Sequence, residues 1–223
     1  PLMAGANFRY AEDRGPALVD PLFATSMGEA RVHELIFESL YTDDQNLAPV
    51  PLLASGVVVE DGGRSALVTL RAGVQWHDGK PLRPEDVVFT IAALKDPGTM
   101  SPEAGRVAFI DRAEAVGTNQ VRLHFVQPES RPQEKLYFKI LPAHRFTGTA
   151  ISRNDAFHTR PIGTGPYQLS RFQPDNSIQL TATSQSGRQP QIPEVVMREV
   201  SDKNYQAKLL LYESLEALVR VLP

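Results

Sequence analysis

Two histidine–acid pairs are the first places where this chain could carry metal or acid–base chemistry. His33-Glu34 begins like the motif His-Glu-x-x-His, in which two histidines one helical turn apart bind zinc. The fifth position is Phe37, so the second ligand is absent, and we interpret the pair as the polar face of an amphipathic helix. His77-Asp78 has residue types suited to acid–base work, but turn geometry explains Asp78-Gly79 better.

A candidate for phosphate binding is the glycine-rich segment Gly163-Thr164-Gly165. Gln168 stands where the pattern Gly-x-Gly-x-x-Gly requires its third glycine. Pro166 also removes an amide donor where a bound phosphate would need one. We therefore expect a structural turn that leads into a strand.

The remaining polar side chains form no catalytic set. His124 falls within an expected strand, and His144 and His158 stand alone in loops. The sequence has no Gly-x-Ser-x-Gly nucleophile elbow, and no two carboxylates have a spacing that assigns acid–base work. These failures favour binding over catalysis and predict no catalytic residue, no metal site and no cofactor.

The composition narrows the class of protein further. The chain has 223 residues, with 23 Lys+Arg against 26 Asp+Glu and a formal net charge of −3. Nucleic acid is therefore a poor candidate partner, because binding to phosphates requires a basic surface. The absence of cysteine excludes disulfides, a thiolate nucleophile and cysteine-ligated metals. No apolar run approaches the roughly 20 residues that span a bilayer, and Pro1–Tyr10 shows no signal peptide.

Short strands and helices must position these residues. Phe8 and Tyr10 alternate on one face of a strand expected over 6–11. The Ser26-Met27-Gly28-Glu29 segment has the form of a capping box, and apolar residues at helical spacing predict a helix over about 27–40. Further expected elements are a hairpin around Asp61-Gly62-Gly63, a helix from Pro84, strands over 107–116, 121–126, 167–172, 178–183, 194–200 and 215–222, and a helix capped by Asp202.

The pattern of elements predicts the fold class. The middle of the chain is rich in strands and reads as α+β, whereas its end reads as β-α-β, which is typical of a parallel sheet. We therefore expect an α/β (α+β) protein without internal repeats.

Four segments together resemble one family, the peptide-type extracellular solute-binding proteins of ABC importers, solute-binding family 5. Leu70–Phe89 resembles the pattern LR.GV.(W/F)HDG.P(L/F)..EDVVF. Residues 33–41 with 49–54, 140–144 and 161–167 resemble three other family blocks in the same order, FE.L……P.LA, ILP.H and P.GTGPY. The resemblance spans about residues 7–222. Arg83 departs from it, because a small capping residue is usual there, and the stretch after Leu94 is short.

The resemblance implies the first lobe of a type II periplasmic-binding-protein-like fold with an inserted β-rich subdomain. Residues 1–48 and 163–223 would form the α/β core of this lobe, and residues 49–162 would form the β-rich subdomain, in which Trp76 packs. The second lobe would be absent from this chain, whose last residues read as a strand that stops at Pro223.

The resemblance also implies a ligand held between two lobes, near the loop that precedes the first helix. The end of the first strand is a second candidate region, because open α/β sheets bind ligands at the carboxyl ends of their strands. Helix capping alone for Ser26 and a solvated acidic turn for the strand end are the alternatives. The predicted ligand-binding residues are Thr25, Ser26 and Met27 of the loop, Tyr10, Glu12 and Asp13 of the strand end, and Glu103.

The function implied is that of a non-enzymatic, monomeric solute-binding subunit, which captures peptides or similar small solutes for an ABC permease in the membrane. Such a protein would be periplasmic or extracytoplasmic, and a lipid anchor on the full-length protein would fit this reading. The alternative is the ligand-sensing domain of a cytoplasmic transcription regulator, which predicts a DNA-binding segment upstream instead of a signal sequence. The solute itself cannot be predicted from this chain.

Overall fold

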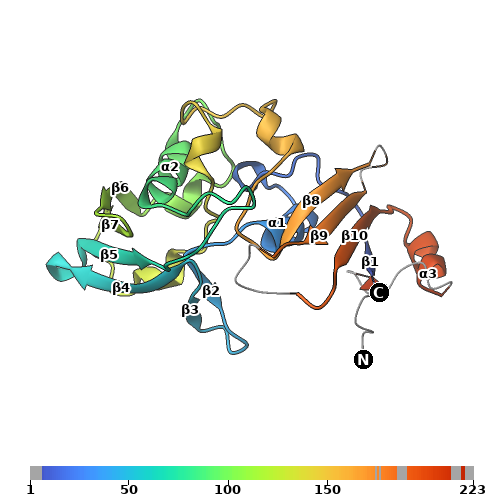
Figure 1. Cartoon of the computed structure of the whole chain (residues 1–223), viewed down its shortest axis with the longest axis horizontal. Coiled ribbons are helices and arrows are strands. Elements are labelled where there is room, and N and C mark those ends of the chain that lie inside the picture. The colour runs from blue at the N-terminus through green and yellow to red at the C-terminus, as the bar shows by residue number, and fades with distance from the viewer. Residues whose placement is uncertain (1–6, 174, 176, 185–189, 212–216, 219–223) are drawn as a thin grey trace.

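The chain folds into two main β-sheets at opposite ends of an elongated molecule, with helix α1 between them (Figure 1). The computed structural model describes residues 7–173, 175, 177–184, 190–211 and 217–218. The described helices and strands are β1 (Phe8–Glu12), α1 (Met27–Ile36), β2 (Tyr41–Asp43), β3 (Pro49–Pro51), β4 (Ala54–Glu60), β5 (Ser65–Leu70), α2 (Pro84–Lys95), β6 (Ile110–Val116), β7 (Gln120–Phe125), β8 (Tyr167–Phe172), β9 (Ile178–Ala182), β10 (Glu194–Glu199), α3 (Lys203–Leu211) and β11 (Ala217–Leu218).

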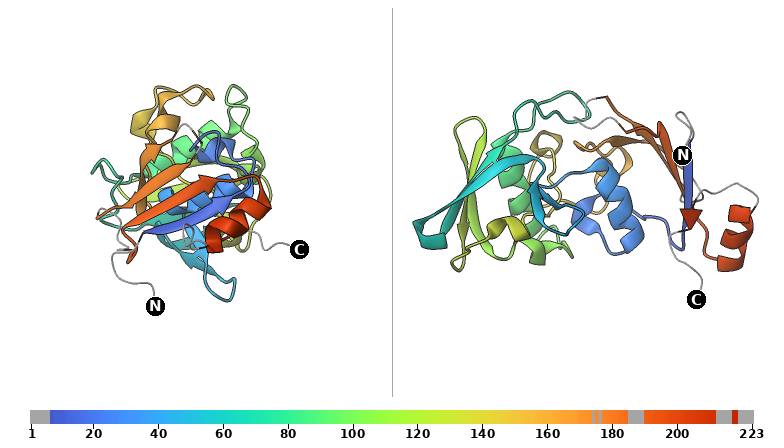
Figure 2. Two further views of the ribbon diagram at one scale, coloured as in Figure 1. Left: turned by 90° about the vertical axis from the view of Figure 1, so that its right-hand side faces the viewer. Right: turned by 90° about the horizontal axis from the view of Figure 1, so that it is seen from below.

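The five-stranded sheet has the order β11-β1-β10-β9-β8. Strand β1 lies between β10 and β11 and is parallel to both, so the β10–α3–β11 unit is the predicted β-α-β connection. Phe8 and Tyr10 share one face of β1 with ring centroids 6.1 Å apart, as their alternation predicts. Helix α1 lies on the side of this sheet that faces the rest of the molecule, and α3 lies beyond its other side (Figure 2). The predicted α/β (α+β) class is confirmed.

The four-stranded sheet, β4-β5-β7-β6, is antiparallel throughout. Its hairpins turn at Asp61–Gly63 and near Gly117, where glycines have the positive φ that these turns require. The strand expected over 107–116 begins only at Ile110, because Ala104–Val107 form a 3₁₀ helix. Helix α2 packs against β6 and β7 and covers one face of the sheet.

Helix α1 begins as its capping box predicts but ends earlier than the expected residue 40. Ser26 Oγ accepts from the backbone N–H of Glu29 at 3.2 Å, and the Glu29 carboxylate accepts from the N–H of Ser26 at 3.0 Å. The helix stops at Ile36, whose carbonyl accepts from the N–H of Gly165 at 2.9 Å instead of from residue 40. The following residues run extended, and the carbonyl of Glu38 accepts from Ile140.

His77 joins two of the segments that carry the family resemblance. Its Nδ1 accepts from the N–H of Gly163 at 3.2 Å, and its Nε2 lies 2.9 Å from the carbonyl oxygen of Gly165. The N–H of His77 also donates to the carbonyl of Gly163. One nitrogen accepts and the other donates, so the ring is neutral with its proton on Nε2. Burial lowers the pKa of His77, which favours this neutral form.

Asp86 fixes the start of helix α2. Its Oδ2 accepts from Trp76 Nε1 at 3.2 Å and from the N–H of Arg83 at 2.9 Å. Its Oδ1 accepts from the N–H of Ala143 at 2.8 Å. Arg83 is the N-cap but makes no side-chain capping bond, so the carboxylate of Asp86 satisfies the helix end from within. Trp76 is fully buried, as predicted.

The buried apolar side chains form one continuous cluster that includes both sheets, for example Val68 of β5 and Leu180 of β9. The division into a core (1–48 and 163–223) and a subdomain (49–162) therefore stays a prediction. Strands β2 and β3 pair with each other although the predicted boundary, between residues 48 and 49, falls between them. Asp202 caps α3 as expected, with Oδ1 accepting from Asn204 at 2.8 Å. Most of the strand expected over 215–222 lies outside the described residues, and so does Tyr212, which the apolar spacing after Asp202 also assigned to the helix.

Candidate functional site

The loop before α1 is fixed by a single buried carboxylate. Glu29 Oε2 accepts from the N–H of Thr25 at 2.7 Å and from its hydroxyl at 3.0 Å. It also accepts from the N–H of Ser26, so three donors converge on one oxygen. Met27, the first residue of α1, is 65% exposed. The start of α1 therefore presents an exposed apolar side chain directly after a loop whose backbone is held by hydrogen bonds.

The end of β1 contacts helix α1, which follows this loop. Glu12 is only 7% exposed, and both of its carboxylate oxygens contact Arg31 of α1, at 2.8 and 3.1 Å. Tyr10 is also buried, and burial raises the pKa of its hydroxyl. Asp13 is half-buried and accepts from Gln206 Nε2 at 3.0 Å. The solvated acidic turn is therefore wrong for Glu12, which is an internal partner of Arg31.

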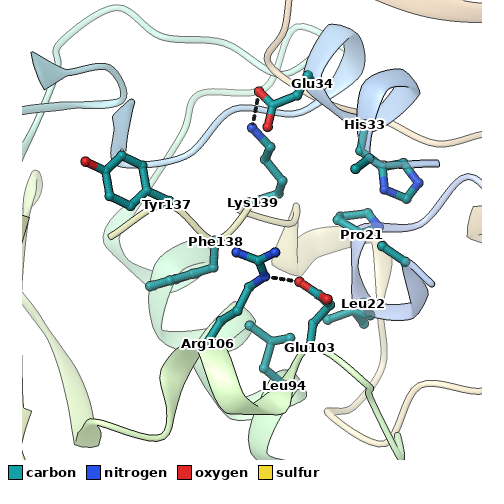
Figure 3. A pocket seen from close by; sticks show the side chains of 12 residues that line it. Pro21, Leu22, His33, Glu34, Leu94, Glu103, Arg106, Tyr137, Phe138 and Lys139 are labelled. Carbon is teal, nitrogen blue, oxygen red and sulfur yellow. Dashed lines mark hydrogen bonds and ion pairs between the residues drawn. The ribbon is translucent and has the colours of Figure 1, made fainter. Parts of the chain in front are cut away.

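A small cavity of about 80 Å³ lies between this loop and the segment that follows α2 (Figure 3). Leu22 and Ala24 line it from the loop side, and Glu103 lines it from the opposite segment. Ser101 Oγ donates to the carbonyl of Leu22 at 2.5 Å, which ties the two walls together. The structure thus places Glu103 close to the loop that carries Thr25, although 78 positions separate them in the sequence.

Two ion pairs border the cavity, and Figure 3 shows both. Lys139 Nζ lies 2.6 Å from Glu34 Oε2, and Arg106 pairs with Glu103. The lining also includes apolar side chains, among them Phe138. Each of the two cations is therefore already paired with a carboxylate at the edge of a partly apolar cavity.

His33 also lines the cavity, but it is only 2% exposed, so its predicted place on a polar helix face is wrong. The ring packs edge-on against Phe37, with centroids 5.9 Å apart. Burial lowers the pKa of His33 to about 4, so the ring is neutral near pH 7. His33 Nε2 has no hydrogen-bond partner among the described residues.

The structure brings together only part of the predicted site. Thr25 and Ser26 lie on the loop, Met27 begins α1, and Glu103 lines the cavity. Tyr10 and Glu12 lie on β1 and Asp13 follows it, where Glu12 pairs with Arg31 of α1 and Asp13 accepts from Gln206 of α3. Sequence reasoning missed Arg106 and Lys139 at the cavity. The spacing of Glu103 and Arg106, three residues apart, was the available signal for one of the two ion pairs.

The described residues offer recognition groups but no metal-binding cluster. Among them, no three His, Asp or Glu side chains gather where a metal ion could be held. Within the same part of the chain, every helix is too short or too polar to cross a membrane. The groups around the cavity supply charge, hydrogen bonds and apolar contact, which are the interactions that sites for small solutes use.

Comparison with known proteins decides the family. Residues 48–219 match the family described as bacterial extracellular solute-binding proteins, family 5. The chain belongs to this family. One curated relative is the probable peptide-binding protein YejA of Agrobacterium fabrum. It is 32% identical to this chain over 188 residues, which cover 78% of this chain and 29% of YejA. The glutathione-binding protein GsiB of Salmonella choleraesuis is 25% identical over 94% of this chain and 41% of its own length.

The fold is that of a solved family member. The oligopeptide-binding protein AppA of Bacillus subtilis, crystallised with a nonapeptide, matches 96% of this chain with a TM-score of 0.90 at 22% identity. The match covers 44% of AppA, so the chain spans less than half the length of the relatives it matches. These three proteins are named for binding peptides or glutathione, and none is named as a transcription regulator, so the regulator alternative gains no support.

Proposed function

We propose that the whole protein captures a peptide or similar small solute between two lobes and delivers it to an ABC permease. The family match over residues 48–219 is the observation that carries this proposal. The chain would supply the first lobe, with its loop and cavity forming one wall of the cleft. The second wall would come from a part of the protein outside this chain.

The proposed contacts follow from what the site exposes. Met27 provides an apolar wall, and the backbone around Thr25 and Ser26 offers polar groups. Glu103, with its partner Arg106, faces the ligand from the opposite wall. Because Glu12 is buried, we propose that the strand end acts by supporting the loop, together with Tyr10 and Asp13. The supporting residues are Tyr10, Glu12 and Asp13, and the contact residues are Thr25, Ser26, Met27 and Glu103.

Several further properties belong to the same proposal. The protein would act as a monomer outside the cytoplasm, either free or held by a lipid anchor, and it would bind no nucleic acid. It would release its ligand unchanged, since no catalytic set was found in the sequence. Fractionation of cells that express the full-length protein tests the location, and light scattering tests the oligomeric state.

Calorimetry on the full-length protein tests the function. We expect a dissociation constant of about 1 μM or tighter for peptides in a pool of synthetic tri- to nonapeptides. Glutathione, nickel chelates and sugars serve as separate arms that define the solute class. If none of these solutes binds, the proposal is wrong.

A pair of matched variants tests the proposed wall. Met27→Gln should weaken peptide binding about tenfold, because an exposed apolar contact worth about 1 to 2 kcal/mol is lost. Val58→Gln is the control, since Val58 is 63% exposed but lies on β4 of the distant sheet. Equal affinities for both variants would remove Met27 from the site.

A further inference from the structure

A buried ion pair links the loop before α1 to a segment that lies far away in the sequence. His158 Nδ1 lies 3.2 Å from Asp20 Oδ2, and the two side chains are 4% and 0% exposed. Neither atom has a well-aligned hydrogen-bond partner among the described residues, so each depends on the other. Burial without such a partner would be costly for a carboxylate.

The surroundings of His158 favour a proton on both ring nitrogens. Nδ1 faces the carboxylate of Asp20, and Nε2 lies 2.9 Å from the carbonyl oxygen of Ser152. Both neighbours are acceptors, and only the imidazolium form has two N–H donors. Burial by itself would lower the pKa of His158, but the contacts with Asp20 and the Ser152 carbonyl outweigh it, and the pKa is raised.

Asp20 also binds the backbone of the loop through its second carboxylate oxygen. Its Oδ1 accepts from the N–H of Leu22 at 2.8 Å and caps the 3₁₀ turn Pro21–Phe23. The ring of Phe23 packs edge-on against His158, with centroids 5.6 Å apart. This turn leads directly into Thr25, so the ion pair sits at the base of the proposed ligand-contacting loop.

Other titratable and charged groups face the pair from the elements around it. Asp155, on the segment of His158, adds a favourable charge. Arg153 lies over the ring of Phe23, with its Cζ 4.8 Å from the ring centroid. His33 of α1 feels the charge of Asp20, but burial lowers its pKa to about 4 and keeps it neutral. Among these groups, His158 is the one whose protonated form is favoured by its contacts, including the one with Asp20.

We propose that His158 and Asp20 form a proton-dependent clamp that positions the loop over residues 20–27. When His158 loses its proton, the clamp opens and the loop loses its fixed geometry. The clamp stands independently of the ligand, but its effect on affinity rests on the proposed function. His158 and Asp20 are positioning residues in this scheme, because neither side chain is exposed to a ligand.

Nuclear magnetic resonance on the full-length protein tests the clamp without any ligand. The His158 ring should titrate above its ordinary pKa of 6.5 in the wild type. In Asp20→Asn the titration should fall to 6.5 or below, because burial remains but the carboxylate is gone. Amide hydrogen exchange of residues 20–27, corrected for intrinsic rates, should rise at least about fivefold between pH 6 and pH 9 in the wild type only.

The exposed pair His144–Asp78 provides the matched control. Its atoms lie 2.7 Å apart, but both side chains are more than a fifth exposed. Asp78→Asn should leave the exchange of residues 20–27 unchanged at both pH values. A wild-type His158 pKa of 6.5 or lower, or loop exchange that does not change with pH, would overturn the clamp even if Asp20→Asn fails to fold.

Peptide affinity provides the functional readout. Binding to the peptide pool should weaken about fivefold or more from pH 6 to pH 9 in the wild type, but not in His158→Gln. An affinity that falls equally in both proteins would show that the clamp does not act on the site. If no peptide binds at either pH, the proposed function fails, whereas the resonance and exchange results still decide the clamp.

Discussion

The close approach of the α1 backbone to Gly163 explains why a glycine occupies this turn. A Cβ placed there would lie 1.8 Å from the carbonyl oxygen of Ile36, far inside any tolerated contact. That oxygen ends helix α1 and accepts from Gly165, whose own Cβ would also meet it at 2.7 Å. The Gly-Thr-Gly segment therefore serves backbone contact, not phosphate binding, in agreement with the sequence prediction of a structural turn.

We expect Gly163→Ala to destabilise the full-length protein by about 3 kcal/mol or more, because backbone atoms of α1 must move to admit the methyl group. Thermal unfolding followed by circular dichroism measures the loss as a lower melting temperature. Gly148→Ala is the control, since a Cβ at Gly148 meets nothing within 4 Å. Equal melting temperatures for the two variants would contradict the close contact.

At the scale of elements, the start of helix α2 depends on one side chain. Asp86 accepts from Trp76, Arg83 and Ala143, and so connects the helix to a hairpin turn and to the segment after residue 140. Burial raises the pKa of Asp86, which is the cost of placing a carboxylate there. The three donors offset that cost.

Asp86→Asn should lower the free energy of unfolding by about 2 to 4 kcal/mol, because the amide nitrogen replaces an acceptor and leaves at least one buried donor unpaired. Urea unfolding of the full-length protein measures this change. Asp111→Asn, at an exposed carboxylate paired only with Arg112, should cost less than about 1 kcal/mol. A similarly small loss of unfolding free energy in both variants would show that the three hydrogen bonds of Asp86 do not stabilise the fold.

At the scale of the whole molecule, two buried histidines with opposite pKa shifts contribute to how stability varies with pH. The folded pKa of His33 is lowered, so its contribution is complete above 6.5 and is lost as the pH falls toward 4. The folded pKa of His158 is raised, so its contribution is complete below 6.5 and is lost as the pH rises through the folded pKa. Stability from these two groups is therefore greatest near pH 6.5.

The acid side of this profile should fall by about 3 kcal/mol between pH 6.5 and pH 4, from the shift of His33. Urea unfolding at a series of pH values measures both sides. The difference in unfolding free energy between the wild type and His158→Gln should be constant at acidic pH and should decrease at alkaline pH. A difference that does not vary with pH would refute the assignment to His158.

Local rules predicted much of this fold from the sequence. The capping box at Ser26 and Glu29, the glycine turn at Asp61–Gly63 and the cap at Asp202 each depend on neighbours within four residues. For this reason the pattern alone located them. The site residues Thr25 and Met27 came from family resemblance. The structure places Thr25 in a hydrogen-bonded loop and Met27 exposed at the start of α1, without testing whether they bind.

Contacts between distant residues explain what the sequence could not predict. Helix α1 ends at Ile36 because Gly165 takes its carbonyl, and no local signal marks that competition. His33 carries a polar side chain at a position that tertiary packing buries. His158 stands alone in the sequence, and only the fold brings Asp20 to it. The sequence likewise does not predict that Glu12 is buried against Arg31, because the fold brings these two residues together.

The position of β1 has a consequence for the order of assembly. The first strand pairs with β10, and Asn7 and Glu194 at that junction are 187 positions apart in the chain. At about 5 to 20 residues per second, roughly 10 to 40 s pass before a ribosome supplies this partner. The four-stranded sheet, from residues 54–125, is complete well before then. During that interval the aromatic face of β1 has no neighbouring strand, which is the state that holdase chaperones recognise in newly made chains.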